Sequence, residues 1–439
     1  MLDNINNFIS ILNIFYILGS SISNYYFLNF LSKFFNKIEK KERLELIKNI
    51  GDKLEKINIF YVKIFQSLSL NDVLLYDNEK DYLLKYSDNV PYNSDDIDYN
   101  ILDEIEDKYN IHLDVSEPLN SGIIGVVFKG IYGENNKKVV IKIIKNNIKN
   151  KIEKAFQELE LFIYLSSSIP YIKKLNLKKF LLDNKELLLD QTNFRKEVNN
   201  IQIFKEKNIN NKEFIIPECY PEITNKYNNV IVMENIKGLT FNDIKNYDEK
   251  IKYEFGKLLV KFGIISILYN SAAHCDVHPG NLFFYINEDS DLKPKYQIGY
   301  IDFGIVAFPS RENQYIYYTF FKDIQIDKDF SKLEMVIMGI ICEKEILKNL
   351  TKNKNEKLYN KLKKLIIGTD DNYDIEFFLQ LSYTINSYGL SFTKEFNNLC
   401  LSLQVAESLT KNLTEGDPRK AQDEVILSFN KINKLLEIE

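Results

Sequence analysis

Two short stretches of the sequence carry polar side chains in a pattern that could handle phosphate and a metal ion. Residues 274–281 read HCDVHPGN, and residues 302–304 read DFG after a short apolar run. An aspartate where an apolar strand ends can hold a divalent cation that bridges phosphate oxygens. By itself DFG fits an ordinary solvated turn equally well, so its meaning depends on the other stretch.

The order and spacing of the polar residues match a phosphoryl-transfer site. Asp276 and Asn281 stand five residues apart, the spacing at which a kinase-type loop offers a carboxylate to the acceptor and an amide oxygen to the metal. We predict Asp276 as the catalytic residue, and Asn281 and Asp302 as magnesium ligands. The plainer interpretation is a turn in which His274 and His278 are satisfied polar residues. A zinc site is disfavoured, because a proline and a glycine follow directly and interrupt any helix presenting both rings on one face.

A lysine and two glycines upstream supply the other features expected around a nucleotide. Lys142 ends the apolar run VVIK and is like the strand lysine that meets nucleotide phosphates. Gly122 and Gly125 precede it, and glycines let the backbone approach phosphates and aim its amide hydrogens at them. Taken singly, the lysine also fits an exposed strand edge, and the glycines also fit a hairpin turn.

The predicted nucleotide site needs a carboxylate partner for the lysine and a segment that meets the base. Glu197, Glu158 and Glu160 lie in helical patterns and are candidates for the partner of the lysine. Met233 and Glu234 end the apolar run NVIVME, and we predict that their backbone contacts the adenine. An ordinary buried strand is the alternative interpretation of this run.

Hydrophobic periodicity predicts an α+β fold with the two lobes of a protein-kinase-like protein. Residues 1–111 read as a helical N-terminal extension that contains an acidic loop. Residues 112–235 read as a β-rich nucleotide-binding lobe, which includes a hairpin around the turn GENN. Residues 236–439 read as a helical catalytic lobe, interrupted by the short strands LFFYI and QIGYIDF.

Composition excludes several function classes. Of the 439 residues, 45% are hydrophobic and 27% are charged, a globular balance that allows a sizeable core. The net charge of −5, with lysines scattered among acids, leaves no basic face, so nucleic-acid binding is not expected. The four cysteines form no C-x-x-C pair, so their spacing predicts neither a zinc site nor a disulfide framework. A reducing compartment is therefore expected.

Residues 8–35 form a strongly apolar run near the N-terminus. Gly19 and nearby serines split it into two segments, each shorter than the about 20 apolar residues needed to cross a bilayer. A buried helix pair is the plainer interpretation, and peripheral contact with a membrane surface is the alternative. The acidic start MLDNINN is unlike a secretory signal or an Arg-rich transit peptide, so no location is assigned from it.

Together these residues resemble the UbiB/ADCK family of atypical kinases, which is associated with coenzyme Q and isoprenoid-lipid metabolism. The family's A-D-P-H-P-G-N is similar to CDVHPGN at residues 275–281, and its E-A-x-N is similar to EVNN at residues 197–200. The second similarity favours Glu197 as the partner of Lys142. The resemblance implies ATP and Mg²⁺ as cofactors, a small-molecule or lipid-related substrate, and a mitochondrion, a plastid or a bacterium as the setting.

Some positions depart from the family's pattern. Its K-x-G-Q motif appears as KIFQ at residues 63–66, with phenylalanine in place of glycine. Its E-x-D motif appears as QTN at residues 191–193, so two carboxylates are replaced by amides that supply no negative charge for Lys63. Its alanine-rich nucleotide loop appears as NSG at residues 120–122, and the glycine makes this loop more similar to that of ordinary protein kinases. These changes indicate altered regulation and nucleotide handling.

Three functions remain open, with an ATP-dependent atypical kinase or ATPase preferred. Cys275 stands where protein kinases usually carry arginine, and no A-P-E tripeptide follows DFG, so a dedicated protein kinase is disfavoured. His278 is a feature shared with small-molecule kinases, which are the alternative; these lack the K-x-G-Q extension. A nucleotide-binding pseudokinase scaffold is the third, although the predicted lysine, glutamate, aspartates and asparagine are all present.

Overall fold

The structure is a computed structural model, and it describes most of the chain beyond residue 39. The described residues are 40–58, 60–61, 82, 90, 92–166, 185, 188–288, 293–368, 375–415, 420–422 and 424–425. The apolar run at residues 8–35 and the KIFQ segment at residues 63–66 therefore lie outside the described residues. Within these ranges no helix is long and apolar enough to cross a membrane.

The chain divides into two compact units. Unit 1 comprises Met1–Arg195 and Tyr220–Met233, and unit 2 comprises Lys196–Cys219 and Glu234–Glu439. The domain boundaries expected after residues 111 and 235 stay predictions.

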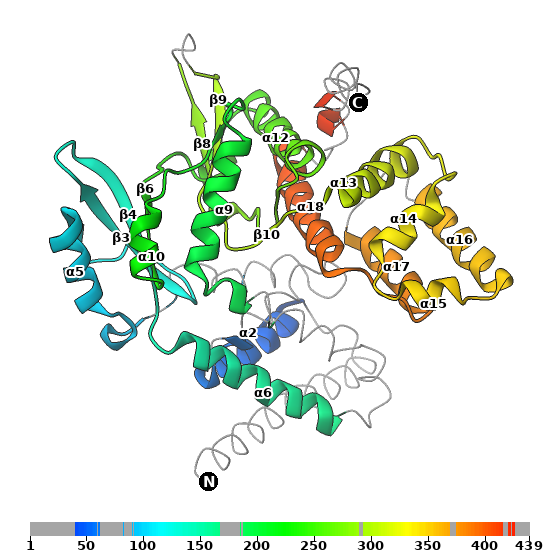
Figure 1. Ribbon diagram of the computed structural model, residues 1–439, viewed down its shortest axis with the longest axis horizontal. Helices are drawn as coiled ribbons and strands as arrows, with labels where there is room; N and C mark the ends of the chain where they lie inside the picture. The colour runs from blue at the N-terminus through cyan, green and yellow to red at the C-terminus, as the bar shows by residue number, and fades with distance from the viewer. Residues whose placement is uncertain are drawn as a thin grey trace. The chain divides into compact units, whose positions relative to one another are not determined.

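Unit 1 contains an antiparallel hairpin at the centre of a five-stranded sheet (Figure 1). The strands are β1 (Ile111–Asp114), β2 (Asn120–Ser121), β3 (Gly125–Tyr132), β4 (Lys137–Ile144) and β6 (Val230–Glu234), in the order β1-β3-β4-β6 with β2 paired to β3. The expected hairpin is confirmed, since β3 and β4 pair in antiparallel register from Tyr132 and Lys137 outward. Gly133 and Asn136 in its turn have positive φ angles of 68° and 51°, which these residue types tolerate.

Unit 1 also contains several helices. They are α2 (Lys40–Ile57), α5 (Tyr99–Tyr109), α6 (Ile148–Ser166) and α10 (Pro221–Lys226), with the short 3₁₀ turn η1 (Ser94–Asp96). Helix α5 begins at Asp98, whose carboxylate accepts a hydrogen bond from the Ile101 N–H, and ends at Asn110 in left-handed geometry. Its apolar face, with Leu102 and Ile105 buried, joins the core under the sheet.

Asn58, Phe60 and Tyr61 attach the extension to helix α6. The Asn58 side-chain amide donates to the Lys151 carbonyl at 2.9 Å, and Phe60 is fully buried. The Tyr61 hydroxyl donates to one carboxylate oxygen of Glu158, which is 2% exposed. The other oxygen of Glu158 is buried with no hydrogen-bond partner among the described residues. Burial and the neighbouring carboxylate raise the pKa of Tyr61, so its hydroxyl keeps its proton and remains a donor.

We predict that Tyr61→Phe lowers the free energy of unfolding by about 1–3 kcal/mol, because it removes the hydrogen bond to a buried carboxylate. Urea denaturation followed by circular dichroism measures this change. Tyr383→Phe is the control, since Tyr383 is 78% exposed on a helix of unit 2. Equal stabilities of the two variants would contradict the anchoring role of Tyr61.

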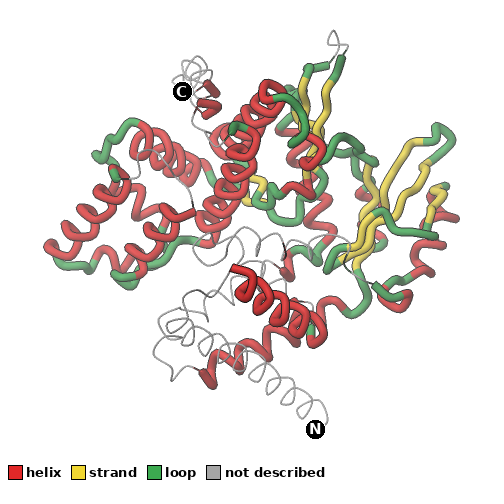
Figure 2. The backbone as a smooth tube through the Cα atoms, turned by 180° about the vertical axis from the view of Figure 1, so that it is seen from behind, coloured by secondary structure: helices red, strands yellow, loops and turns green. Residues whose placement is uncertain are grey.

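Unit 2 is mainly helical, and its strands are short (Figure 2). Its helices are α9 (Phe194–Lys207, of which the first two residues belong to unit 1), α11 (Phe241–Ile244), α12 (Glu249–Ile264), α13 (Arg311–Tyr318), α14 (Leu333–Ile340), α15 (Lys344–Lys348), α16 (Lys352–Ile367), α17 (Ile375–Asn386) and α18 (Lys394–Leu413). Two π-helical stretches, η2 (Ile265–Tyr269) and η4 (Thr319–Ile326), extend α12 and α13, and η3 (Pro279–Asn281) is a 3₁₀ turn.

The strands of unit 2 form two small sheets around the predicted catalytic segments. One has the order β5 (Phe214–Ile215), β9 (Tyr296–Tyr300), β8 (Leu282–Ile286), and the other pairs β7 (Ala273–His274) with β10 (Val306–Ala307). The expected strand LFFYI is confirmed as β8. The expected strand QIGYIDF is confirmed in its first part as β9, which ends at Tyr300, before Asp302; β8 and β9 pair in antiparallel register. A separate apolar core under α13–α18 includes Phe320, Ile340 and Phe396, each fully buried.

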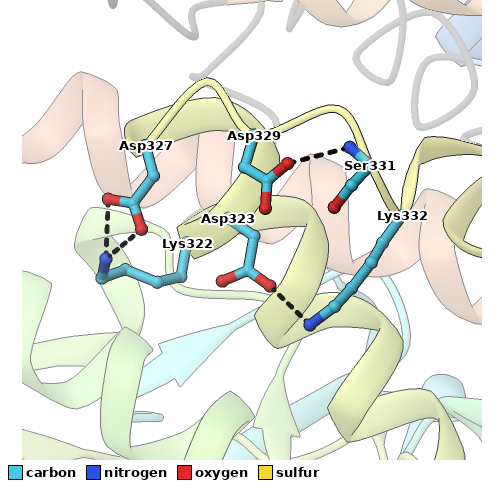
Figure 3. A network of polar contacts seen from close by, with 6 residues as sticks. All are labelled: Lys322, Asp323, Asp327, Asp329, Ser331 and Lys332. Carbon is cyan, nitrogen blue, oxygen red and sulfur yellow. Dashed lines mark hydrogen bonds and ion pairs between the residues drawn. The ribbon is translucent and has the colours of Figure 1, made fainter.

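A polar network links η4 to the loop that follows it (Figure 3). None of its residues belongs to the predicted site. Lys322 pairs with Asp327 at 2.6 Å, and Lys332 pairs with Asp323 at 3.2 Å. The Asp329 carboxylate accepts a hydrogen bond from the Ser331 N–H at 2.9 Å. Partly exposed ion pairs of this kind contribute little to stability.

Candidate functional site

Two strand pairings bring the HCDVHPGN and DFG segments together. At one end, β7 pairs with β10 so that His274 lies opposite Val306, and the Cys275 N–H donates to the Ile305 carbonyl at 2.9 Å. At the other end, β8 pairs with β9 so that Leu282 lies opposite Tyr300. The predicted catalytic loop is therefore held at its two ends by strands β10 and β9, which lie after and before DFG in the chain.

The β8–β9 pairing continues one residue beyond the strands, so that Asn281 lies opposite Ile301, the residue before Asp302. The Ile301 N–H donates to the Asn281 carbonyl at 3.2 Å, and Asp302 is the next residue. Asn281 is only 7% exposed. Sequence spacing predicted Asn281 and Asp302 as metal ligands. The register brings their backbones close together, and the metal role stays a prediction.

Asn281 is also bonded to the predicted catalytic aspartate. Its side-chain nitrogen donates to the Asp276 carbonyl at 3.0 Å and lies 3.4 Å from the Asp276 carboxylate. Because both contacts use the nitrogen, the amide oxygen is the atom that Asn281 can offer to a cation. The Asn281 side chain thus orients two groups of the loop, namely its own amide oxygen and the Asp276 carboxylate.

Asp302 lies at a turn that its own side chain stabilises. One carboxylate oxygen accepts a hydrogen bond from the Gly304 N–H at 2.9 Å. An aspartate and an asparagine supply oxygen ligands of the kind that Mg²⁺ prefers, with phosphates and water completing its shell. The donor set at Asn281 and Asp302 therefore fits Mg²⁺. Within the described ranges no group of three or more His, Cys, Asp or Glu residues could hold a metal by itself.

His274 is a buried structural residue beside Asp276, the predicted catalytic aspartate. It is 3% exposed, and its Nδ1 accepts a hydrogen bond from the Asp276 N–H at 3.2 Å. Its ring centre lies 5.0 Å from that of Phe303 in an edge-to-face arrangement. Burial lowers the pKa of His274 against the attraction of the Asp276 and Asp302 carboxylates, so the ring is neutral.

The two other unusual residues of the loop have different surroundings. Burial, with the Asp276 charge, raises the pKa of the Cys275 thiol to about 12, which makes it a poor nucleophile at neutral pH. His278 begins the 3₁₀ turn η3, and its Nδ1 accepts a hydrogen bond from the Gly280 N–H at 3.1 Å. When His278 is neutral, its proton therefore lies on Nε2, as a donor.

In unit 1, the predicted phosphate-binding residues lie on β3, β4 and the loop before them. The Lys142 ammonium lies 5.2 Å from the ring centre of Phe194, a contact that sequence reasoning missed. A Cβ at Gly125 would meet the Ile143 carbonyl oxygen at 2.8 Å, so close backbone packing requires glycine there. The Gly122 N–H donates to the Gly125 carbonyl at 2.9 Å, so in this conformation it serves the turn.

The candidate carboxylates on helices differ in their surroundings. Glu197 on α9 is 2% exposed, whereas Glu160 is partly exposed. Glu158 accepts the hydrogen bond of Tyr61. Lys142 belongs to unit 1 and Glu197 to unit 2, and their pairing stays a prediction.

The predicted base-contacting segment ends strand β6 and continues into unit 2. Met233 is 6% exposed. The Glu234 N–H donates to the Glu218 carbonyl at 2.7 Å, and its carboxylate accepts from the Glu218 N–H at 3.2 Å. The Ile236 N–H donates to the Glu234 carbonyl at 3.1 Å. Adenine contacts by Met233 and Glu234 stay predictions.

One site residue had no role in the sequence-based account. Asn200 on α9 is 1% exposed, and its side-chain nitrogen donates to the Phe303 carbonyl at 2.8 Å. The signal was present, because Asn200 is the asparagine of the EVNN segment, but sequence alone gave it no partner.

The sequence profile of the ABC1 atypical kinase-like domain family matches residues 88–337, more than half of the chain. The chain is 30% identical over 270 residues to a probable protein kinase UbiB of Glaesserella parasuis serovar 5 (strain SH0165), covering 58% of this chain and 47% of that protein. It is 26% identical over 275 residues to a probable protein kinase UbiB of Erwinia tasmaniensis, covering 60% and 48%. The chain thus spans about half the length of the curated relatives it matches.

Among solved structures, the complex of Rv3197 with erythromycin from Mycobacterium tuberculosis is 17% identical, with a TM-score of 0.47, and the match covers 82% of this chain and 90% of that chain. The family match confirms the resemblance and the α+β kinase-like fold class that the sequence predicted.

Proposed function

The chain belongs to the family of ABC1 atypical kinase-like domains, and on that premise we propose that it binds ATP with Mg²⁺ and hydrolyses it or transfers its terminal phosphoryl group. The observation that carries this proposal is the β8–β9 register, with the Ile301 N–H bonded to the Asn281 carbonyl one residue before Asp302. In the same loop the Asn281 amide is bonded to Asp276. This arrangement matches the parts that phosphoryl transfer requires.

Each residue then has a distinct task. Asp276 orients the hydroxyl or water that attacks, and accepts its proton. Asn281 and Asp302 would hold Mg²⁺, which neutralises phosphate charge when bound. Lys142, paired with Glu197, would orient the α- and β-phosphates. Because this chemistry is mostly positioning, the hydrogen bonds within the loop support it directly.

The phosphoryl acceptor that we propose is a small molecule, a lipid-related hydroxyl or water. A neutral thiol at Cys275 cannot bind a phosphorylated segment as the arginine of many protein kinases does. We further propose that a lipid-related acceptor belongs to isoprenoid or quinone metabolism. We also propose that residues 8–35 make peripheral contact with a membrane. No nucleic-acid partner is proposed.

ATP turnover measured with and without liposomes, with a phenolic quinone-precursor mimic and with a generic peptide tests this function. Lipid- or phenol-stimulated phosphate release without peptide phosphorylation supports it. A phosphorylated peptide with no response to lipid would favour a protein kinase, and a phosphorylated small molecule without lipid dependence would favour a small-molecule kinase. No nucleotide binding at all would overturn the proposal. Flotation with liposomes tests the membrane contact separately.

A further inference from the structure

We propose that Asn200 is a positioning residue that sets the orientation of the Asp302 carboxylate through a single peptide group, and so controls the affinity of the site for Mg²⁺. The metal role of Asp302 rests on the proposed function. The positioning itself rests on contacts within unit 2.

The first contact is the hydrogen bond from Asn200 to the backbone of DFG. The Asn200 side-chain nitrogen donates to the Phe303 carbonyl at 2.8 Å, and Asn200 is 1% exposed. At this depth water does not substitute for the donor, so the Phe303 carbonyl depends on Asn200 for this bond.

The second contact lies on the other side of the same peptide group. The peptide that carries the Phe303 carbonyl also carries the Gly304 N–H, which donates to the Asp302 carboxylate at 2.9 Å. A trans peptide is planar, so its carbonyl and N–H point in opposite directions and rotate together. Holding the carbonyl at Asn200 therefore holds the N–H that orients Asp302.

Helix α9 also holds the side chain of Phe303. Phe204 lies one turn beyond Asn200 on the same face of the helix, where residues four apart are neighbours. Its ring centre is 5.0 Å from that of Phe303, and His274 lies 5.0 Å from Phe303 as well. The DFG segment is thus held by a hydrogen bond on its backbone and by packed rings on its side chain. The hydrogen bond from Asn200 acts on the peptide plane directly, whereas the rings hold the Phe303 side chain.

Asparagine suits this task better than aspartate or leucine, the side chains closest to it in shape or size. An aspartate has nearly the same shape but offers no donor when ionised and would place its charge against a carbonyl oxygen. A leucine has a similar size but neither donor nor charge. Loss of one hydrogen bond of this kind corresponds to about a ten-fold change in an equilibrium constant.

The experiment compares Asn200→Asp and Asn200→Leu with Asn199→Asp. Asn199 is the exposed neighbour on the same helix, so the control introduces the same charge without touching DFG. Two quantities are measured: the Mg²⁺ concentration for half-maximal ATP turnover, and hydrogen exchange of the Gly304 amide without nucleotide. We expect both Asn200 variants to raise the Mg²⁺ requirement about ten-fold and to speed exchange, and the Asn199 variant to do neither.

The two measurements distinguish a failure of the positioning role of Asn200 from a failure of the proposed function. Unchanged exchange in a folded Asn200→Leu protein overturns the positioning. Faster exchange with an unchanged Mg²⁺ requirement reduces Asn200 to a structural residue and overturns its link to the metal. A wild-type protein without Mg²⁺-dependent turnover overturns the proposed function, whereas the exchange measurement still decides the positioning. If Asn200→Asp does not fold, Asn200→Leu carries the comparison.

Discussion

Asp302→Asn is expected to lower Mg²⁺-dependent ATP turnover by roughly 100-fold or more, because it removes the negative charge that would hold the cation against the phosphates. The fold should survive. An asparagine oxygen can still accept the hydrogen bond of the Gly304 N–H, which lies 2.9 Å from the present carboxylate. Turnover at saturating Mg²⁺ and thermal unfolding without ligand measure the two effects.

Asp329→Asn is the matched control for this substitution. Asp329 accepts a hydrogen bond from the N–H two residues ahead at 2.9 Å, the same local geometry as Asp302, but it lies on the loop after η4 (Figure 3). The control removes the same charge from the same kind of turn. Equal turnover by Asp302→Asn and the control would remove the metal assignment.

Lys142→Met is expected to weaken ATP binding and to lower turnover by about 100-fold, because the substitution removes a cation from the predicted phosphate site. Methionine keeps an unbranched apolar stem beside the Phe194 ring, which the Lys142 ammonium now faces at 5.2 Å. The unfolding temperature without nucleotide should therefore change little. The increase in unfolding temperature on adding ATP, fitted over a range of concentrations, reports the loss of affinity.

Lys138→Met is the control, and it tests whether removing any lysine from strand β4 weakens ATP binding. Lys138 lies on the same strand β4 at an even spacing from Lys142, and it is exposed. We expect its ATP-dependent stabilisation to equal that of the wild type. An unreduced stabilisation in Lys142→Met would count against the phosphate role of Lys142.

The elements with strong local signals could be predicted from the sequence. The β3–β4 hairpin follows from two β-rich runs around Gly133 and Asn136, which adopt the positive φ angles that their types allow. The β8–β9 pair follows from two apolar runs around a polar turn. The spacing of Asp276, Asn281 and Asp302 was informative because phosphoryl transfer constrains it.

Other features depend on contacts between distant residues and could not be predicted. Strands β5, β7 and β10 have two residues each, too few to show a periodic pattern. Glu158 looked like a candidate partner of a lysine, and only the structure brings it against Tyr61. Asn200 lies 103 residues from Phe303 in the chain, so only packing reveals their hydrogen bond.

We propose that Asn281 and Asp302 hold the cation of a bound nucleotide. A crystal structure of the protein grown with a non-hydrolysable ATP analogue and Mn²⁺, with anomalous scattering recorded from the manganese, tests it most directly. We predict an anomalous peak about 2.1 Å from a carboxylate oxygen of Asp302 and from the amide oxygen of Asn281, next to the phosphates. A nucleotide whose Mn²⁺ is held by other residues, or bound elsewhere on the molecule, would contradict the account.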